Sequence, residues 1–253
     1  MKTESLLQYL DRYLGVPGHP DYPRALNGLQ VDGPAEIRKV VACVDASEAS
    51  ILAAAERGAD LLLVHHGLFW DGLVPVTGRR RRKLQLLLER RIGLYSAHLP
   101  LDAHAEVGNC ILLAGALGLE AAGRFGRHES VEIGWWGTLG APEAPERFRD
   151  RVSAAVGGGR VHWVPGGPAQ VEKVGVVTGA GGSFVAEALA VGLDALVTGE
   201  GAHHHHFDAM EGGIHLFLAG HYATETFGVR ALARHLGERF GLEWEFLDQP
   251  TGL

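Results

Sequence analysis

The chain is poor in several residue types, and each shortage excludes something. Its 253 residues include 2 Cys and 2 Met, 8% are aromatic, and only 21% carry a formal charge. Two cysteines without a Cys-x-x-Cys spacing are too few for a disulfide framework. We therefore interpret Cys43 and Cys110 as small buried apolar residues, outside any functional site.

Long apolar runs are also missing. No stretch approaches the ~20 apolar residues that cross a bilayer, and Asp11 and Arg12 interrupt the apolar pattern near the N-terminus, unlike a signal peptide. We expect a soluble, cytoplasmic protein with no membrane partner.

Positive charge is in the minority, with 23 Lys and Arg against 30 Asp and Glu and a net charge of −7. This balance disfavours nucleic acid as a partner, because phosphate affinity comes from clustered positive charge. The one concentrated basic run is Arg79–Lys83. Such a run is usually a solvated helix face, although around a ring it could attract phosphates.

Apolar residues are plentiful, at 46% of the chain, and they occur in a regular rhythm. Strand-like runs alternate with helical patterns at 46–58, 80–91, 145–156 and 183–191; the runs lie at 39–45, 59–65, 92–97, 171–177, 195–198 and 214–218. A middle segment, 129–140, alternates like an antiparallel or edge strand. The sequence predicts an α/β fold whose sheets are mixed but largely parallel, with flanking helices and a duplicated order of elements.

Histidine is the unusual feature, with 14 residues. Three apolar strands end in a histidine followed by another histidine or a carboxylate; the segments are His65-His66, His98 with Asp102, and His221 with Glu225. Ligands of open α/β sheets collect at the carboxyl ends of strands. Imidazole and carboxylate are the donors preferred by Zn, Fe, Mn, Co and Ni. We therefore predict a metal site.

Spacing favours two ions over one. Neighbouring His65 and His66 on an extended strand point in opposite directions, which suits two different metals. His221 and Glu225 share a face if a helix begins near Gly220, and Glu225 could then bridge both ions. Any one of these pairs alone is more often an ordinary loop or surface pair, but three of them after three apolar strands favour metal.

Two further segments are ambiguous. The run His203–His206 either lines the metal cleft as acid/base groups or begins a solvated helix, and the sequence favours neither. Gly179–Ser183 is a glycine-rich turn that could hold an anion on its backbone N–H groups. Because it lacks the lysine of a phosphate loop, we interpret it as a tight structural turn.

These segments also resemble a known family, the YbgI-like dinuclear metal centre proteins, which are labelled GTP cyclohydrolase type 2 homologs. The matching motifs are NGLQV from Asn27, VDAS from Val44, LLLVHHGLFW from Leu61, YSAHLPLDA from Tyr95, VTGEG from Val197 and GHYATE from Gly220. The resemblance implies two intertwined α/β repeats, a homohexameric ring and two divalent metals bound between the repeats of each subunit. It implies the metal ligands His65, His66, Asp102, His221 and Glu225.

We predict a first repeat over 1–125, on which 214–253 packs back, and a second repeat over 126–213. The expected activity is metal-dependent hydrolysis of a C=N, cyclic amide or phosphoester bond of a small molecule, with His98, His205 and His206 as candidate catalytic residues. Two alternatives stay open: a non-enzymatic metal-binding ring scaffold, and a ring that handles nucleic acid.

Overall fold

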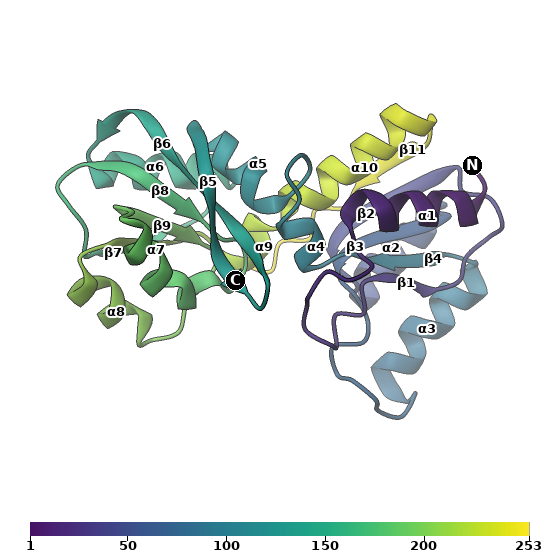
Figure 1. The fold of residues 1–253 in the computed structure, drawn as a ribbon. Coiled ribbons are helices and arrows are strands. Elements are labelled where there is room, and N and C mark those ends of the chain that lie inside the picture. Colours follow the sequence, from purple (N-terminus) through teal and green to yellow (C-terminus); the bar gives the residue numbers. More distant parts are fainter. Residues whose placement is uncertain (253) are drawn as a thin grey trace. The chain divides into compact units, whose positions relative to one another are not determined.

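The computed structural model describes residues 1–252. The chain forms two compact units, and the ribbon in Figure 1 labels their elements. Met1–Leu101 and Gly228–Gln249 build the first unit, and Asp102–Phe227 is the main part of the second. The fold class predicted from the sequence is confirmed, since both sheets are mixed and flanked by helices.

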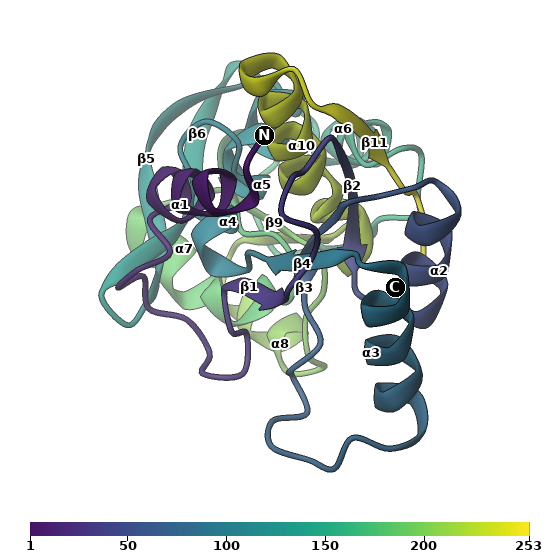
Figure 2. The same cartoon turned by 90° about the vertical axis from the view of Figure 1, so that its right-hand side faces the viewer.

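The first unit contains a five-stranded sheet. Its strands, in spatial order, are β1 (Gly28–Val31), β4 (Gly93–Ser96), β3 (Leu61–His66), β2 (Lys39–Asp45) and β11 (Glu243–Phe246). The four strands from β4 to β11 are parallel and β1 is antiparallel. Its helices are α1 (Thr3–Leu14), α2 (Glu48–Glu56), α3 (Gly78–Arg90) and most of α10 (Thr226–Phe240). In both views α2 and α3 lie side by side (Figures 1 and 2).

Local sequence explains these elements. Helix α1 buries Leu6, Leu10 and Leu14, which recur every four residues on one face. Helix α2 begins with a capping box, in which Ser47 and Ser50 each bind the other's backbone N–H. Strands β2 and β3 are almost continuously buried, as expected for parallel strands covered on both faces.

The second unit contains a six-stranded sheet. Its spatial order is β5 (Leu119–His128), β6 (Val131–Glu143), β8 (Val171–Val176), β9 (Ala195–Thr198), β10 (His215–Leu218) and β7 (His162–Pro165). Its helices are α5 (Asn109–Ala116), α6 (Pro145–Ala155), the 3₁₀ helix η1 (Gly181–Phe184), α7 (Val185–Val191), α8 (His205–Gly212) and α9 (His221–Thr224). The short helix α4 (Leu99–Asp102) contains the transition from the first unit to the second.

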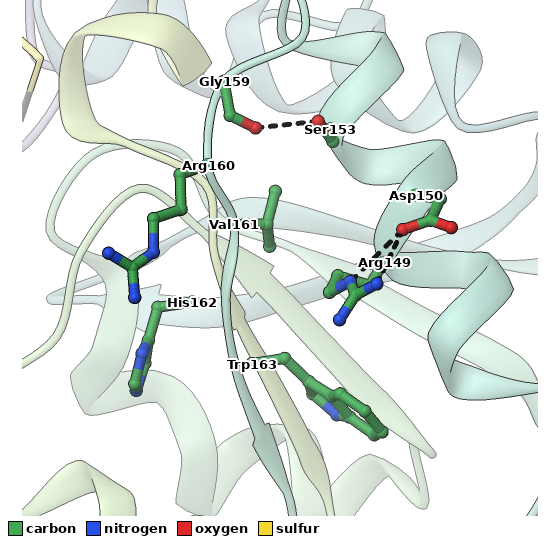
Figure 3. Close-up of a pocket in the computed structure, with 8 residues that line it drawn as sticks. All are labelled: Arg149, Asp150, Ser153, Gly159, Arg160, Val161, His162 and Trp163. Atoms are coloured by element: carbon green, nitrogen blue, oxygen red, sulfur yellow. Dashed lines mark hydrogen bonds and ion pairs between the residues drawn. The ribbon is translucent and has the colours of Figure 1, made fainter.

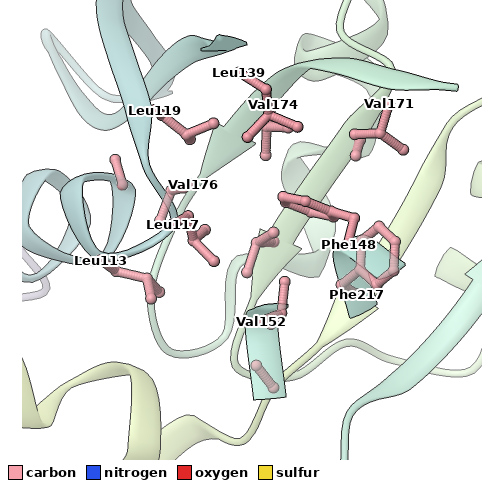
Figure 4. Packing of buried hydrophobic residues seen from close by; sticks show 14 of the residues in the cluster. Leu113, Leu117, Leu119, Leu139, Phe148, Val152, Val171, Val174, Val176 and Phe217 are labelled. Atoms are coloured by element: carbon pink, nitrogen blue, oxygen red, sulfur yellow. The ribbon is translucent and has the colours of Figure 1, made fainter. Parts of the chain in front are cut away.

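A closely packed apolar core supports the second sheet. Phe148 of α6 meets Phe217 of β10 edge to face, with ring centroids 5.2 Å apart, and both side chains are fully buried (Figure 4). Valines of β8, Leu113 of α5 and Leu117 just after α5 help to complete the cluster around them. This core fixes β8, β9 and β10, whose carboxyl ends lead into the candidate site.

The unit boundaries differ from the predicted repeat boundaries. The first unit gives way to the second at Leu101, not after residue 125, because α5 and β5 pack against β6 of the second sheet. Within 214–253, β10 belongs to the second sheet, whereas β11 pairs with β2 of the first. Strand β6 is antiparallel, as its alternation indicated, but it is internal because β5 and β8 flank it.

In the part of the chain that the structure describes, residues 1–252, no helix has the length and apolar character required to cross a membrane.

Candidate metal centre

In the first unit, three histidines gather at the carboxyl edge of the sheet. Strand β3 lies between β2 and β4, runs parallel to both, and ends in His65 and His66. His98 follows the end of β4. The candidate ligand atoms of these three histidines all lie within 4.8 Å of one another, and His65 is completely buried. The first unit therefore presents a compact set of imidazole nitrogens.

Each of these imidazole rings has a hydrogen-bond acceptor at its Nδ1 atom. The Nδ1 atoms lie 2.8 Å from Ala97 O for His65, 2.9 Å from Asp45 Oδ1 for His66 and 2.8 Å from Asp21 Oδ1 for His98. A carbonyl or carboxylate oxygen can only accept, so each Nδ1 carries the hydrogen and donates it. In the neutral ring the lone pair then lies on Nε2, which is the tautomer required of a metal-ligating histidine.

Asp21 fixes the loop around His98 as well as its ring. Its Oδ2 accepts hydrogen bonds from Asn27 Nδ2 at 2.7 Å and from the backbone N–H of Leu99 at 3.0 Å, while Asn27 Oδ1 accepts from the backbone N–H of His98. Burial alone would raise the pKa of Asp21, but these hydrogen bonds and the charge of His98 lower it below its usual value. Asp21 therefore remains a carboxylate that orients His98.

In the second unit, two buried carboxylates face one another. Asp102 is 4% exposed and Glu225 2% exposed, and their candidate ligand oxygens lie within 4.8 Å. Asp102 Oδ1 accepts hydrogen bonds from Asn109 Nδ2 at 2.8 Å and Thr178 Oγ1 at 3.0 Å. Two carboxylates buried so close together repel each other, and a cation would relieve this repulsion.

His221 connects Glu225 to a further carboxylate. Helix α9 begins at His221, whose Nδ1 lies 2.9 Å from Glu200 Oε1 and whose Nε2 lies 3.2 Å from Glu225 Oε1. Burial alone would lower the pKa of His221, but Glu225 and Glu200 outweigh it and raise the pKa to about 9. Here again a carboxylate orients the ring through Nδ1.

Glycine at position 179 lets the backbone approach these donors. Gly179 has a φ of +63°, and a Cβ there would overlap Glu225 Oε1 and lie 3.2 Å from His221 Nε2. Its N–H donates to Thr224 Oγ1 at 3.1 Å. The glycine-rich segment is thus a tight turn whose first residue, Gly179, lies close to the Glu225 carboxylate.

The histidine run begins helix α8. His205 is partly buried, its Nδ1 accepts a hydrogen bond from the N–H of Ala202 at 2.9 Å, and burial followed by the charge of His204 lowers its pKa. His206 is exposed. His204, His205 and Asp208 also bring candidate ligand atoms within 4.8 Å of one another.

The donor chemistry fits a divalent metal. All predicted ligands are imidazole nitrogens or carboxylate oxygens, which suit borderline to hard ions. His66, His98 and His221 also have a carboxylate at the opposite ring nitrogen, an arrangement typical of zinc-type sites. Sequence reasoning overlooked these three carboxylates as ring-orienting groups. Asp45 and Glu200 could have been found as acidic residues at strand ends, whereas no local pattern pointed to Asp21.

Of two cavities in the described residues, one adjoins these groups. A cavity of about 240 Å³ in the first unit includes Asp45 and His66 in its wall. A larger one of about 450 Å³ lies beside β7 and α6 in the second unit and is lined by Arg149, Asp150, Ser153, Gly159, Arg160, Val161, His162 and Trp163 (Figure 3). There Arg149 is paired with Asp150 and Ser153 with Gly159 O. No residue predicted for the site contributes to the larger cavity.

Together, the fold and these donors define an α/β protein with candidate metal-binding clusters. Comparison with known proteins gives its family. The model of the DUF34/NIF3 (NGG1p interacting factor 3) family matches residues 1–251. The chain belongs to this family, which confirms the resemblance drawn from the sequence motifs.

Relatives and solved structures agree over the whole length. A Deinococcus radiodurans protein called "GTP cyclohydrolase 1 type 2 homolog" is 44% identical over 251 residues, covering 99% of this chain and 94% of the relative. A Halobacterium salinarum protein of the same name is 45% identical over 249 residues, covering 97% of each chain. The crystal structure of TTHA1606 from Thermus thermophilus is 42% identical with a TM-score of 0.87, and the structure of protein ybgI is 38% identical with a TM-score of 0.93; both cover 100% of both chains.

Proposed function

We propose that the chain binds two divalent metal ions and uses them for hydrolysis. The ligands are the five side chains predicted from the sequence: His65, His66, Asp102, His221 and Glu225. The observation that carries this proposal is the common orientation of the histidines. His65, His66 and His221 each direct Nδ1 to an oxygen acceptor, which makes Nε2 the nitrogen that would coordinate a metal.

When bound, a pair of divalent ions lowers the pKa of water toward neutrality and polarises a carbonyl, C=N or phosphoryl group. The chain's own residues hold the donors in place for this chemistry. Asp45 and Glu200 orient His66 and His221, and Gly179 keeps the backbone close to Glu225. Which of Zn, Fe, Mn, Co and Ni occupies the site depends on the ions available to the protein, because this donor set accepts all of them.

His98 is the first candidate for proton transfer. Its Nδ1 is bound to Asp21, so Nε2 is the atom that accepts or delivers a proton. His205 and His206 remain the second candidates, as residues that would contact the substrate from helix α8. Replacing His98 by Gln should lower turnover while leaving bound metal in place, whereas replacing His65 by Ala should remove both.

The reaction class to test first comes from the relatives. The shared name of the D. radiodurans and H. salinarum proteins, "GTP cyclohydrolase 1 type 2 homolog", supports ring-opening hydrolysis of a purine nucleotide. The experiment incubates the metal-loaded protein with GTP, cyclic amides and phosphoesters and follows product formation by chromatography. Turnover that His65→Ala abolishes supports the proposal. No turnover of any of these, with metal content intact, would favour a non-enzymatic metal-binding scaffold.

The proposal includes assembly as a homohexameric ring in the cytoplasm, as the resemblance implied. Light scattering on the full-length protein tests the ring through its molar mass. A stable monomer or dimer would contradict it.

A further inference from the structure

The smaller cavity gives the basic run a place in the site. It lies in the first unit, has a volume of about 240 Å³, and is lined in part by the proposed metal ligand His66 and by Asp45, which orients the His66 ring. Its remaining wall comes from the residues that follow β2 and β3 and from the start of α3. Arg79–Lys83, which the proposed function leaves unused, supplies three of the lining side chains.

The residues of the basic run fall into two sets according to their positions along helix α3. Arg79, Arg80 and Lys83 line the cavity, and Arg79 and Arg80 lie four and three positions before Lys83, which makes each a neighbour of Lys83 on the helix surface. Arg82 instead forms two hydrogen bonds with Glu48, at 2.9 and 3.0 Å, and is not part of the cavity wall. Arg81 also lies outside the wall. The run is therefore two sets of cations with different surroundings, one of them beside the metal donors.

Charges in the cavity wall are unevenly balanced. Arg79 is paired with Asp71 at 3.0 Å, and Asp45 is bound to His66. Lys83 Nζ donates to the carbonyl of Ala46 at 2.7 Å.

Arg80 donates to the carbonyl of Gly72 at 2.9 Å, and its guanidinium lies over the ring of Phe69. A carbonyl oxygen accepts a hydrogen bond from a cation without neutralising its charge. Lys83 and Arg80 therefore contribute positive charge to the cavity wall. Burial, followed by the charge of Arg79, lowers the pKa of Lys83, and these effects outweigh the carboxylates of Asp71, Glu48 and Asp45, which raise it.

Two buried donors in the wall lack acceptors. Within residues 1–252, Arg80 Nε and Trp70 Nε1 are both buried and have no hydrogen-bond partner. A buried N–H without an acceptor costs roughly 1–3 kcal/mol, more for a charged group. Both belong to residues that line the cavity, where an oxygen-rich ligand would supply acceptors.

Two helix N-termini at the cavity wall also favour a negatively charged ligand. Ala46 and Ser47, just before α2, and Arg79 and Arg80, in the first turn of α3, all border the cavity. The N-terminal ends of two helices thus lie at its wall, and each carries partial positive charge that favours an anion.

We propose that this cavity binds the phosphoryl group of the substrate, with Lys83 and Arg80 as its binding residues. This rests on the proposed function, because the group held here would belong to the molecule hydrolysed at the neighbouring metal donors. A phosphoryl group offers several acceptor oxygens and up to two negative charges, which match a guanidinium fork and an ammonium. The substrate class is therefore a phosphorylated small molecule.

The test is isothermal titration of the full-length protein, as purified, with inorganic phosphate. Wild type should bind, and Arg80→Gln and Lys83→Gln should each weaken binding by about tenfold or more, because each removes a charge-assisted contact. Arg81→Gln is the matched control: it removes the same charge from the same helix outside the cavity wall, and binding should change by less than about twofold. The two cavity variants are independent, so one that fails to fold leaves the other to decide.

Three results would overturn the proposal: no phosphate binding by wild type, an equal loss in Arg81→Gln, or a loss in His65→Ala with none in Lys83→Gln or Arg80→Gln. The last result would place phosphate on the metal instead of in the cavity. Metal content of the same samples separates this proposal from the proposed function. If phosphate binds to protein that contains no metal, the phosphate site is supported and the proposed metal centre is contradicted.

Discussion

Asp45 and His66 are register partners across β2 and β3, and the carboxylate accepts a hydrogen bond from His66 Nδ1 at 2.9 Å. Pairing of two parallel strands therefore places the orienting carboxylate beside the imidazole without any loop. The sheet itself sets the direction of Nε2. The same relation between a carboxylate and Nδ1 recurs in Asp21 with His98 and Glu200 with His221.

Replacing Asp45 by Asn should weaken metal binding by roughly 10–100-fold, the usual effect of losing an orienting carboxylate. The expected cause is loss of the charge that fixes the tautomer and the ring orientation of His66. Competition with a chromophoric chelator measures the affinity. Asp150→Asn is the control, because Asp150 pairs with Arg149 on the exposed side of α6. Equal affinities in the two variants would show that Asp45 does not support the metal.

Gly179→Ala should lower both metal affinity and stability, because the added Cβ overlaps Glu225 Oε1. Gly192→Ala is a close match: Gly192 also has a positive φ, +77°, but its Cβ would meet nothing within 4 Å. The control should therefore show only the backbone penalty of about 1 kcal/mol. Thermal unfolding with and without added metal compares the two. If the two variants have the same thermal stability with and without metal, the closeness of Gly179 to the donors affects neither stability nor metal binding.

Glu143 should make stability pH-dependent. Two hydrogen bonds from Arg151, at 2.7 and 3.0 Å, lower the pKa of this carboxyl below its ordinary value. A lowered folded-state pKa stabilises the protein above the ordinary pKa of about 4.5. That contribution is lost as the pH falls through the lowered pKa.

The Glu143–Arg151 contribution should be no more than about 1 kcal/mol, because Arg151 is partly solvated. Urea unfolding of wild type and Glu143→Gln at pH 7 and at pH 3 measures it. The gap between the two proteins should be present at pH 7 and smaller at pH 3. A gap that widens on acidification would contradict the assignment.

Phe217→Ala should destabilise the second unit by about 3–5 kcal/mol, the range for a large buried aromatic, since Phe217 packs against Phe148 in a closed core. Phe207→Ala should have an effect below about 1 kcal/mol, because Phe207 is 50% exposed on α8. Urea denaturation of both variants is the measurement. Similar losses would mean that Phe217 is not a core residue in solution.

Much of the fold was predictable from local pattern. Strand β9 spans the predicted residues 195–198, and the apolar runs ending at Asp45 and His65 mark β2 and β3, because strands covered on both faces must be apolar throughout. The hairpin partner β5 was missed, since Leu119–His128 mixes charged and glycine residues without a period of two. Strand β11 was also missed, because its pairing with β2 joins segments about two hundred residues apart.

The candidate site was predictable in its strand-end donors and less so in their supports. His65, His66 and Glu225 stand next to apolar strands or in a recognisable spacing. Asp21 lies in a loop, and its hydrogen bond to His98 spans 77 residues, which no periodicity encodes. The basic run gained its meaning only from α3, which places Lys83 and Arg80 beside the cavity and turns Arg82 to Glu48.

Elemental analysis of the protein purified without added metal, beside a His65→Ala variant, counts the ions of the proposed dinuclear centre. We expect about two divalent ions per chain in the wild type and a clear loss in the variant, with both proteins folded by circular dichroism. Fewer than one ion per chain in the wild type, or equal content in the two proteins, would contradict the dinuclear metal centre.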